Sequence, residues 1–271
     1  MRKLLTTTIT LCLSILSIGQ VHDTTMYRQN KVKSVSTWVH MIAFEKSNDT
    51  CLSAVKEINK QGSPTYVKMD YHCQGWDVIN ELKYTYDENN FMSGLTTLQN
   101  DQVISELAVT VDSFGRIRTE KNKFFEPYTE IEVRNVYFGE GKDADSMYAA
   151  EVSGTDTTYF MTKYTYSNNR LIKSNTVNAT TNKPVNMLTN RFDQKGRLTR
   201  SEFIYFLGYD NDNITKYEYN DKDQIIKTKS ELTDLVAEFY YTKDGLPTKT
   251  FYYNKFGALE GEVWYKYTYY E

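Results

Sequence analysis

The sequence predicts an all-β protein built from tandem antiparallel β-hairpins, which form one large curved or closed meander sheet. Three observations predict this class. A turn motif recurs along the chain, aromatic residues make up 14% of it with 23 Tyr, and the residues beside each turn alternate between apolar and polar. Tyr, Phe, Thr and Val are the residues that suit a pleated, half-buried surface.

The motif is an aromatic or aliphatic residue, then Asp, Asn, Ser or Thr, two variable residues, usually Gly, and an aliphatic residue two places later. Its polar openers are Asn59, Asp87, Asp112, Ser167, Asp193, Asn220, Thr242 and Asn254. The steps between openers are 28, 25, 55, 26, 27, 22 and 12 residues. A unit of about 26 residues therefore repeats, and one copy near residue 139 is blurred.

Each copy predicts a type I turn closed by a glycine bulge, because the opener can bond its own backbone and Gly can adopt positive φ. This geometry predicts six facing pairs beside the turns: Tyr86–Met92, Val111–Ile117, Tyr166–Ile172, Phe192–Leu198, Tyr219–Ile225 and Tyr253–Leu259. The same alternation extends one apolar face to Tyr84, Val109, Tyr164, Tyr217, Phe239 and Phe251.

Such an apolar face has to be covered. A sheet of fourteen or more strands also has more strands than open twisted sheets usually have. We therefore expect the sheet to curl or close. Residues 20–271 are expected to form a single domain with a long surface loop at about 138–158, where Gly and Asp interrupt the repeat. Residues 49–61 fit either a short helix or a strand, and the turn motif at Asn59 favours the strand.

Residues 1–19 have the features of a secretory signal peptide: Arg2 and Lys3, an uncharged apolar stretch, and a small-x-small site before Gln20. The mature protein is therefore expected to be exported, to the periplasm, the cell surface or the medium. No later run is apolar enough for a transmembrane helix. The net charge is −3 with both signs interleaved, which does not favour nucleic acid as a partner.

The motif resembles the YD repeats of Rhs-type bacterial proteins and of teneurins, which run roughly Tyr-Asp-x-x-Gly-Arg-Leu. The copies most similar to it are 192–198, Phe-Asp-Gln-Lys-Gly-Arg-Leu, and 111–117, Val-Asp-Ser-Phe-Gly-Arg-Ile. The resemblance covers about residues 55–271. It implies hairpins that wind into a shell or barrel, and it brings no catalytic residue. The chain looks more like the short exported proteins of Bacteroidetes that have degenerate repeats of this kind and no assigned function.

Few residues are candidates for a site. Cys51 and Cys73 share a face beside the turn at Gly62, so in an oxidising compartment they form a disulfide or remain two buried thiols. His40, His72 and Cys73 lack the paired spacing of metal ligands, and no cofactor motif is present. The carboxy-terminal aromatic residues form a binding surface or a last strand that closes the sheet: Trp264, Tyr265, Tyr267 and Tyr269.

The function that these observations favour is binding or scaffolding by an exported, non-catalytic protein of the cell envelope or extracellular space. A glycan or another envelope protein is the expected partner, and no catalytic residue, metal or cofactor is expected. Two alternatives remain open. One is a glycan-active enzyme with a carboxylate pair in a sheet groove, and the other is an outer-membrane β-barrel.

The cysteine pair gives the first testable prediction. If Cys51 and Cys73 form a disulfide, the unreduced mature chain should weigh less than the reduced chain by two hydrogen atoms, and mass spectrometry of peptides should join their two segments. Complete alkylation of both thiols in unreduced, denatured protein would contradict the pairing.

Overall fold

The structure is a computed structural model that describes residues 24–42, 50–72, 75–139, 143–206 and 212–271. It contains one short helix, α2 (Thr24–Gln29), and eighteen strands within these ranges. The strands are β1 (Val32–Met41), β2 (Cys51–Ile58), β3 (Pro64–Asp70), β4 (Ile79–Tyr86), β5 (Met92–Gln99), β6 (Gln102–Val111), β7 (Ile117–Phe125), β8 (Tyr128–Phe138), β9 (Ser146–Ser153), β10 (Asp156–Ser167), β11 (Arg170–Asn178), β12 (Pro184–Phe192), β13 (Leu198–Tyr205), β14 (Asn213–Tyr219), β15 (Ile225–Ser230), β16 (Val236–Tyr241), β17 (Pro247–Tyr253) and β18 (Leu259–Tyr269).

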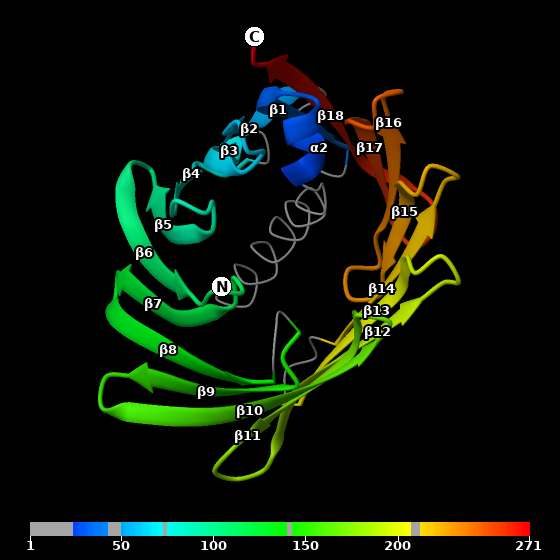
Figure 1. The fold of residues 1–271 in the computed structure, drawn as a ribbon. Helices are drawn as coiled ribbons and strands as arrows, with labels where there is room; N and C mark the ends of the chain where they lie inside the picture. The colour runs from blue at the N-terminus through cyan, green and yellow to red at the C-terminus, as the bar shows by residue number, and fades with distance from the viewer. Residues whose placement is uncertain (1–23, 43–49, 73–74, 140–142, 207–211) are drawn as a thin grey trace.

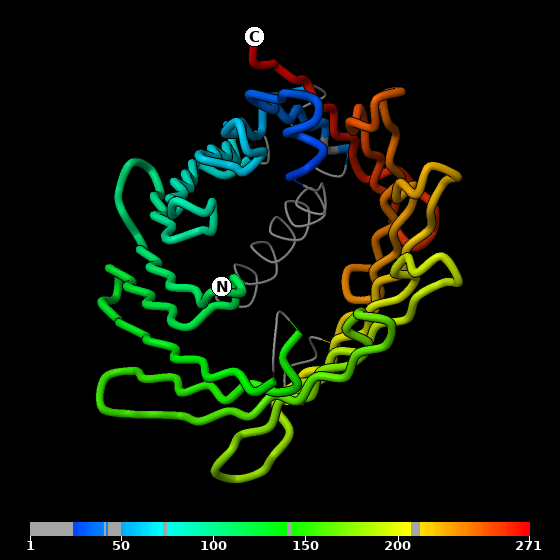
Figure 2. The backbone as a smooth tube through the Cα atoms, in the orientation of Figure 1, coloured from blue at the N-terminus to red at the C-terminus, as the bar shows by residue number. Residues whose placement is uncertain are grey.

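All eighteen strands belong to one sheet, in which each strand pairs antiparallel with the next along the chain. The last strand, β18, pairs antiparallel with β1, so the sheet closes on itself as a meander barrel. The ring is visible in Figure 1, and the backbone tube of Figure 2 follows it from β1 round to β18. The prediction of an all-β hairpin meander is confirmed, and of its two forms the closed one is observed.

The recurrent turns lie on one rim of the barrel, here called the Asx rim. Strands alternate in direction, so the hairpins that follow even-numbered strands all return at this rim. In six of them the opener accepts hydrogen bonds from the turn backbone, as when the Arg197 N–H donates to Asp193 Oδ1 at 2.9 Å. The bulge position has positive φ, for example 81° at Gly196 and 62° at Asp223. The turn at Asn254 joins β17 to β18 and therefore lies on the opposite rim.

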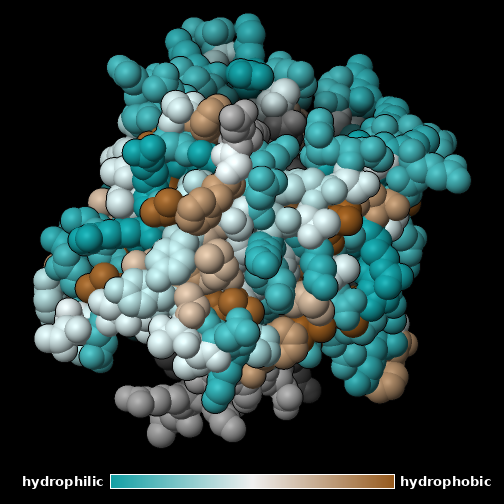
Figure 3. Space-filling view, turned by 60° about the horizontal axis from the view of Figure 1, so that its bottom comes forward, coloured by the Kyte–Doolittle hydropathy of each residue, from teal (hydrophilic) through white to brown (hydrophobic). Residues whose placement is uncertain are grey.

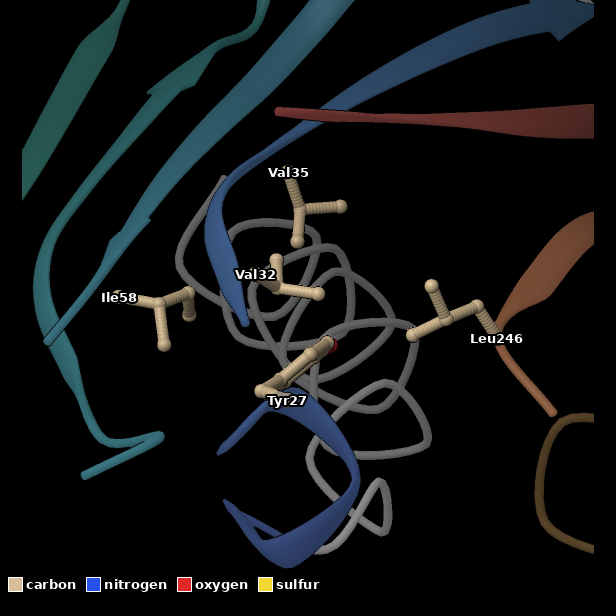
Figure 4. Close-up of a cluster of buried hydrophobic side chains, with 5 residues drawn as sticks. All are labelled: Tyr27, Val32, Val35, Ile58 and Leu246. Carbon is tan, nitrogen blue, oxygen red and sulfur yellow. The ribbon is translucent and has the colours of Figure 1, made fainter. Parts of the chain in front are cut away.

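One face of the sheet is turned into the barrel, where α2 lies (Figure 1). Tyr27 of α2 packs against Val35 of β1, Ile58 at the end of β2 and Leu246 before β17 in a buried cluster. Figure 4 shows the side chains of Ile58 and Leu246 pointing toward Tyr27 from opposite sides. A second buried cluster joins β16, β17, β18 and β1 and consists of Val39, Ala237, Phe239, Tyr252 and Val263. These clusters form the core, on the side of the barrel where the sheet closes.

The other face is the outer wall, and charged residues of opposite sign face each other across its strands. Lys121 lies opposite Glu132, and Lys227 lies opposite Glu238. Their Nζ–Oε distances are 3.5 Å and 3.2 Å. In the view of Figure 3, hydrophilic residues cover most of the surface, and apolar residues lie among them in small groups. No helix within the described residues is long and apolar enough to cross a membrane.

Three sequence predictions require correction. The expected loop at 138–158 contains β9 and the start of β10, because the Gly and Asp residues lie before and after β9, whose own sequence contains neither. Tyr166 faces Leu171 instead of Ile172, because Asn168 and Asn169 form a two-residue turn. Phe251 was expected on the apolar inner face but lies on the outer wall opposite Glu262. The turn that follows it, at Asn254, is on the other rim, so the alternation of faces counted from that turn is reversed.

The strand prediction for residues 49–61 is confirmed by β2. The predicted signal peptide at 1–19 and Cys73 lie outside the described residues.

The uneven core gives a prediction for stability. Phe239 is 7% exposed within the second cluster, whereas Phe203, on the inner face of β13, is 36% exposed. Phe239→Ala should lower the free energy of unfolding by about 3 to 5 kcal/mol, because it empties a packed site. Phe203→Ala should cost clearly less in the same urea titration. Equal losses for the two variants would contradict a core concentrated at the closure.

Candidate binding surface

The turns of the Asx rim are joined to one another by arginine. Arg197 Nε donates to Asp193 Oδ2 at 2.7 Å within its own turn. Its Nη1 reaches the next turn and donates to Asp223 Oδ1 at 2.8 Å, and the guanidinium lies 4.8 Å from the ring centroid of Tyr219. The Arg197 backbone N–H, with help from the guanidinium, lowers the pKa of the Asp193 carboxyl. These charges are used in holding adjacent hairpins together.

Arg116 repeats this arrangement with Asp112, at 2.7 Å, and lies 4.8 Å from the ring centroid of Tyr137. Where the opener is Asn220, Gln224 takes the place of Arg and accepts a hydrogen bond from Asn220 Nδ2 at 2.8 Å. In these three turns the side chain of the opener is therefore bonded to that of the residue after the bulge. This explains why the best YD-like copies contain both Asp and Arg.

The repeated tyrosines have a second structural role. Their hydroxyl groups donate to backbone carbonyls of the preceding hairpin, beyond its turn. The donor and acceptor pairs are Tyr86 to Pro64, Tyr219 to Leu198, Tyr241 to Ile225 and Tyr267 to Pro247, at 2.5 to 2.9 Å. Asn135 and Asn190 make the same type of bond to Ile117 and Leu171. The sequence pattern predicted Tyr86 and Tyr219 as apolar ladder residues, and the hydrogen bonds of all four tyrosines were missed.

Within the part of the chain that the structure describes, Lys56 faces the interior. Lys56 lies on the inner face of β2, opposite Val35 and Val67. Its Nζ is 6.0 Å from the ring centroid of Tyr27, and burial lowers the pKa of its ammonium group. Among the described residues it has no ion-pair partner. Its stem packs under α2, so we assign it a structural role.

Two carboxylates outside the turns also face inward. Glu120 of β7 lies opposite Val133 of β8, and Val133 lies opposite Glu151 of β9. The two glutamates are therefore two strand spacings apart, roughly 9 to 10 Å at the backbone. This separation is at the upper end of the range of about 6.5 to 9.5 Å found between carboxyl groups of inverting glycosidases.

The cysteine and histidine candidates are not brought into one cluster. Cys51 is disulfide-bonded. Because Cys73 lies outside the described residues, their pairing stays a prediction. His72 is held between Asp70 and Asp77, with both N–O distances at 2.6 Å, and these two hydrogen bonds raise the pKa of its imidazole. His40 lies on the outer wall opposite Glu262 of β18.

A row of large side chains crosses the outer wall where the barrel closes. Facing residues on five consecutive strands of the ring are Tyr240, Lys249, Trp264, Trp38 and Leu52. Phe251 and Tyr253 lie beside this row. The ring centroid of Phe251 is 5.4 Å from that of Tyr240 and 6.3 Å from that of Tyr253. We call Trp38, Tyr240, Phe251, Tyr253 and Trp264 the aromatic wall.

Two lysines lie over these rings. Lys249 Nζ is 4.2 Å from the ring centroid of Phe251 and 5.0 Å from that of Trp264. Lys266 Nζ is 4.7 Å from the centroid of Trp38. Tyr240 is 48% exposed, whereas the other four rings are half-buried. The wall can therefore offer ring faces and ammonium donors to a ligand that lies flat on it.

The aromatic residues singled out from the sequence divide between the two faces. Trp264 belongs to the aromatic wall, whereas Tyr265 and Tyr267 point inward and pack against the buried clusters. Tyr269 is exposed near the end of β18. The other wall residues come from β1, β16 and β17. Only the pairing of the first strand with the last places Trp38 beside Trp264, and no local pattern predicts that pairing.

No family model and no curated protein sequence matches the chain. Among solved structures, it is similar to a porin-like protein from Bacteroides uniformis ATCC 8492, with 9% identity, coverage of 88% of this chain and 97% of that chain, and a TM-score of 0.47. A porin-like protein from Bacteroides vulgatus ATCC 8482 has 13% identity, coverage of 69% and 94%, and a TM-score of 0.35. A Photorhabdus luminescens Tc holotoxin pore has 13% identity, coverage of 76% and 13%, and a TM-score of 0.38.

The tyrosine hydrogen bonds give a testable prediction. Tyr267→Phe should lower the free energy of unfolding by about 1 to 3 kcal/mol, because the buried Pro247 carbonyl loses its donor. Tyr269→Phe is the matched control on the same strand, since its ring is 53% exposed. Denaturant titration measures both. A silent Tyr267→Phe would show that the hydroxyl does not hold the hairpins together.

Proposed function

We propose that this chain is an exported, non-catalytic β-barrel that binds glycans on its outer wall. The observation that carries the proposal is the aromatic wall. Aromatic faces with nearby hydrogen-bond donors suit flat sugar rings, whose C–H faces are apolar and whose edges are polar. The row of facing residues spans five strands, or roughly 19 Å from strand spacing, which is long enough for an extended chain of several sugars.

The charged residues of the outer wall support the proposal that this wall faces water and not lipid. A membrane-spanning barrel carries an apolar outward band, and Lys or Arg at its midplane costs about 2 to 4 kcal/mol. Here Lys249 of the aromatic wall region pairs with Glu262 at 3.4 Å, in the middle of the outer wall. Ion pairs such as Lys121–Glu132 continue round the barrel. We therefore propose a place in the periplasm, on the cell surface or in the medium, and not an outer-membrane barrel.

The turn chemistry supports a further assignment, that the chain is a degenerate YD-repeat array. The Asp193 and Arg197 pair, its repetition at Asp112 and Arg116, and the bond from Tyr219 to the preceding hairpin give each motif position a defined contact. These positions stabilise the barrel, so the proposal gives them no catalytic role.

The glycan-active enzyme is the competing function, and it would use Glu120 and Glu151. The proposal predicts that a bound glycan is not cleaved. Release of reducing ends by the parent protein, abolished in Glu120→Gln and Glu151→Gln with the fold retained, would overturn the non-catalytic assignment.

The binding test uses the full mature chain and a panel of soluble neutral and acidic polysaccharides in native affinity electrophoresis. Tyr240→Ala should weaken retardation by the bound polysaccharide about tenfold or more, because an aromatic anchor residue typically contributes about 2 kcal/mol or more to such an interface. Trp264→Ala should do the same.

The matched control is Tyr128→Ala, which removes a ring that is 67% exposed at the β7–β8 turn, away from the aromatic wall. It should leave binding unchanged. Equal effects of Tyr240→Ala and Tyr128→Ala, or no retardation of the parent by any polysaccharide, would contradict the proposed function.

A further inference from the structure

A second feature of the outer wall breaks its charge pattern. Four cationic residues face one another directly across four consecutive strands: Arg191 of β12, Arg200 of β13, Lys216 of β14 and Lys229 of β15. We call them the cationic row. Arg191, Lys216 and Lys229 are exposed, and Arg200 is half-buried.

This arrangement opposes the stability of the sheet, because like charges directly opposite each other are destabilising. Elsewhere the wall pairs opposite signs, as at Lys68–Glu81 and Lys123–Glu130. Among the strand pairs that the structure describes, directly facing like charges occur in the cationic row alone. Glu202 and Glu231 partly compensate, at 3.2 Å from Arg200 and 3.1 Å from Lys216. Arg191 and Lys229, at the two ends, have no ion-pair partner within the described residues.

Carboxylates lie on both sides of the row at its two central strands, β13 and β14. Glu202 lies two residues from Arg200 along β13, and Glu218 lies two residues from Lys216 along β14, on the opposite side of the row. Over these two strands an anionic group is therefore attracted along the row and repelled beside it, whereas on β15 Lys227 adds a positive charge beside the row. A duplex or a membrane surface would bring negative charge over the carboxylates too, so the row suits a narrow, extended anionic chain.

The row also leads to the aromatic wall. Lys229 faces Val236 of β16, and Val236 faces Tyr253 of β17, whose ring lies beside that of Phe251. An extended chain can thus lie along the cationic row and continue onto the aromatic faces. No ring lies within the row itself to stack the bases of a single-stranded nucleic acid, whose binding usually depends on such stacking.

We infer that the ligand is an acidic polysaccharide, whose carboxylate or sulfate groups bind the cationic row while its sugar rings continue onto the aromatic wall. This inference rests on the proposed function and names its substrate class. The cost of facing like charges is offset when the ligand supplies the missing anions.

The test measures the affinity of the full chain for polygalacturonate, dextran sulfate, neutral dextran and oligothymidylate over a series of salt concentrations. The parent should prefer at least one of the two acidic polysaccharides to dextran, and added salt should weaken this binding because it screens exposed charges. Arg191→Gln/Lys229→Gln should weaken acidic binding about tenfold and reduce its salt dependence. These two end residues are chosen because their removal relieves repulsion, so the variant should be at least as stable as the parent.

The control Lys163→Gln/Lys183→Gln removes the same charge from exposed positions outside the row and should bind like the parent. Equal losses in the two double variants, no preference for either acidic polymer, or tighter binding of oligothymidylate would each overturn the inference. If Tyr240→Ala weakens binding while the cationic variant does not, the acidic ligand is wrong and the glycan function stands. If the cationic variant weakens acidic binding while Tyr240→Ala does not, the aromatic wall is wrong.

Discussion

The pairing of β1 with β18 is the contact on which the rest of the structure depends. It removes both free edges of a very long sheet, which would otherwise offer unpaired backbone groups to other chains. It also decides which face is enclosed, and so gives Val35 and Val263 a common interior with Tyr27. The two buried clusters lie at this closure. The same pairing places Trp38 beside Trp264 on the opposite face, so core and candidate site share one cause.

On β10 to β12 the inner face carries polar side chains and is held differently. Thr162 and Thr176 face each other across β10 and β11 with their hydroxyls 2.9 Å apart. Asn190 reaches back to the Leu171 carbonyl. The threonine contact lies within one hairpin, whereas the Asn190 bond joins its hairpin to the one before it, as the tyrosines do elsewhere. The barrel therefore combines a packed apolar sector with a sector in which backbone pairing and short polar bonds supply most of the cohesion.

Local chemistry explains how much of this could be predicted from the sequence. A turn such as the one at Asp193 fixes its own register, so the pair Phe192–Leu198 and the all-β class could be predicted from a few residues. At Asn168 and Asn169 the predicted register was wrong by one residue. These two Asn residues adopt positive φ and form a two-residue turn, whereas the motif predicts a longer turn that ends in Gly. The strand β9 was missed because its pairing is supplied by neighbours. Trp38 was missed because its partner is at the other end of the chain.

The position of the candidate site follows from how the rest of the barrel is used. Inside, Tyr265 and Tyr267 are occupied in packing and in bonds to backbone carbonyls. At the Asx rim, Asp193 and Arg197 are occupied by one another and by the next turn. The outer wall is the remaining surface on which a ligand could bind. Over most of it, charged side chains of opposite sign face each other in pairs. Two regions of it differ: the aromatic wall, which places large rings on the outer face, and the cationic row, which places like charges in register. Both are arrangements that the fold itself does not need. A ligand with flat apolar faces and regularly spaced negative groups would satisfy both at once.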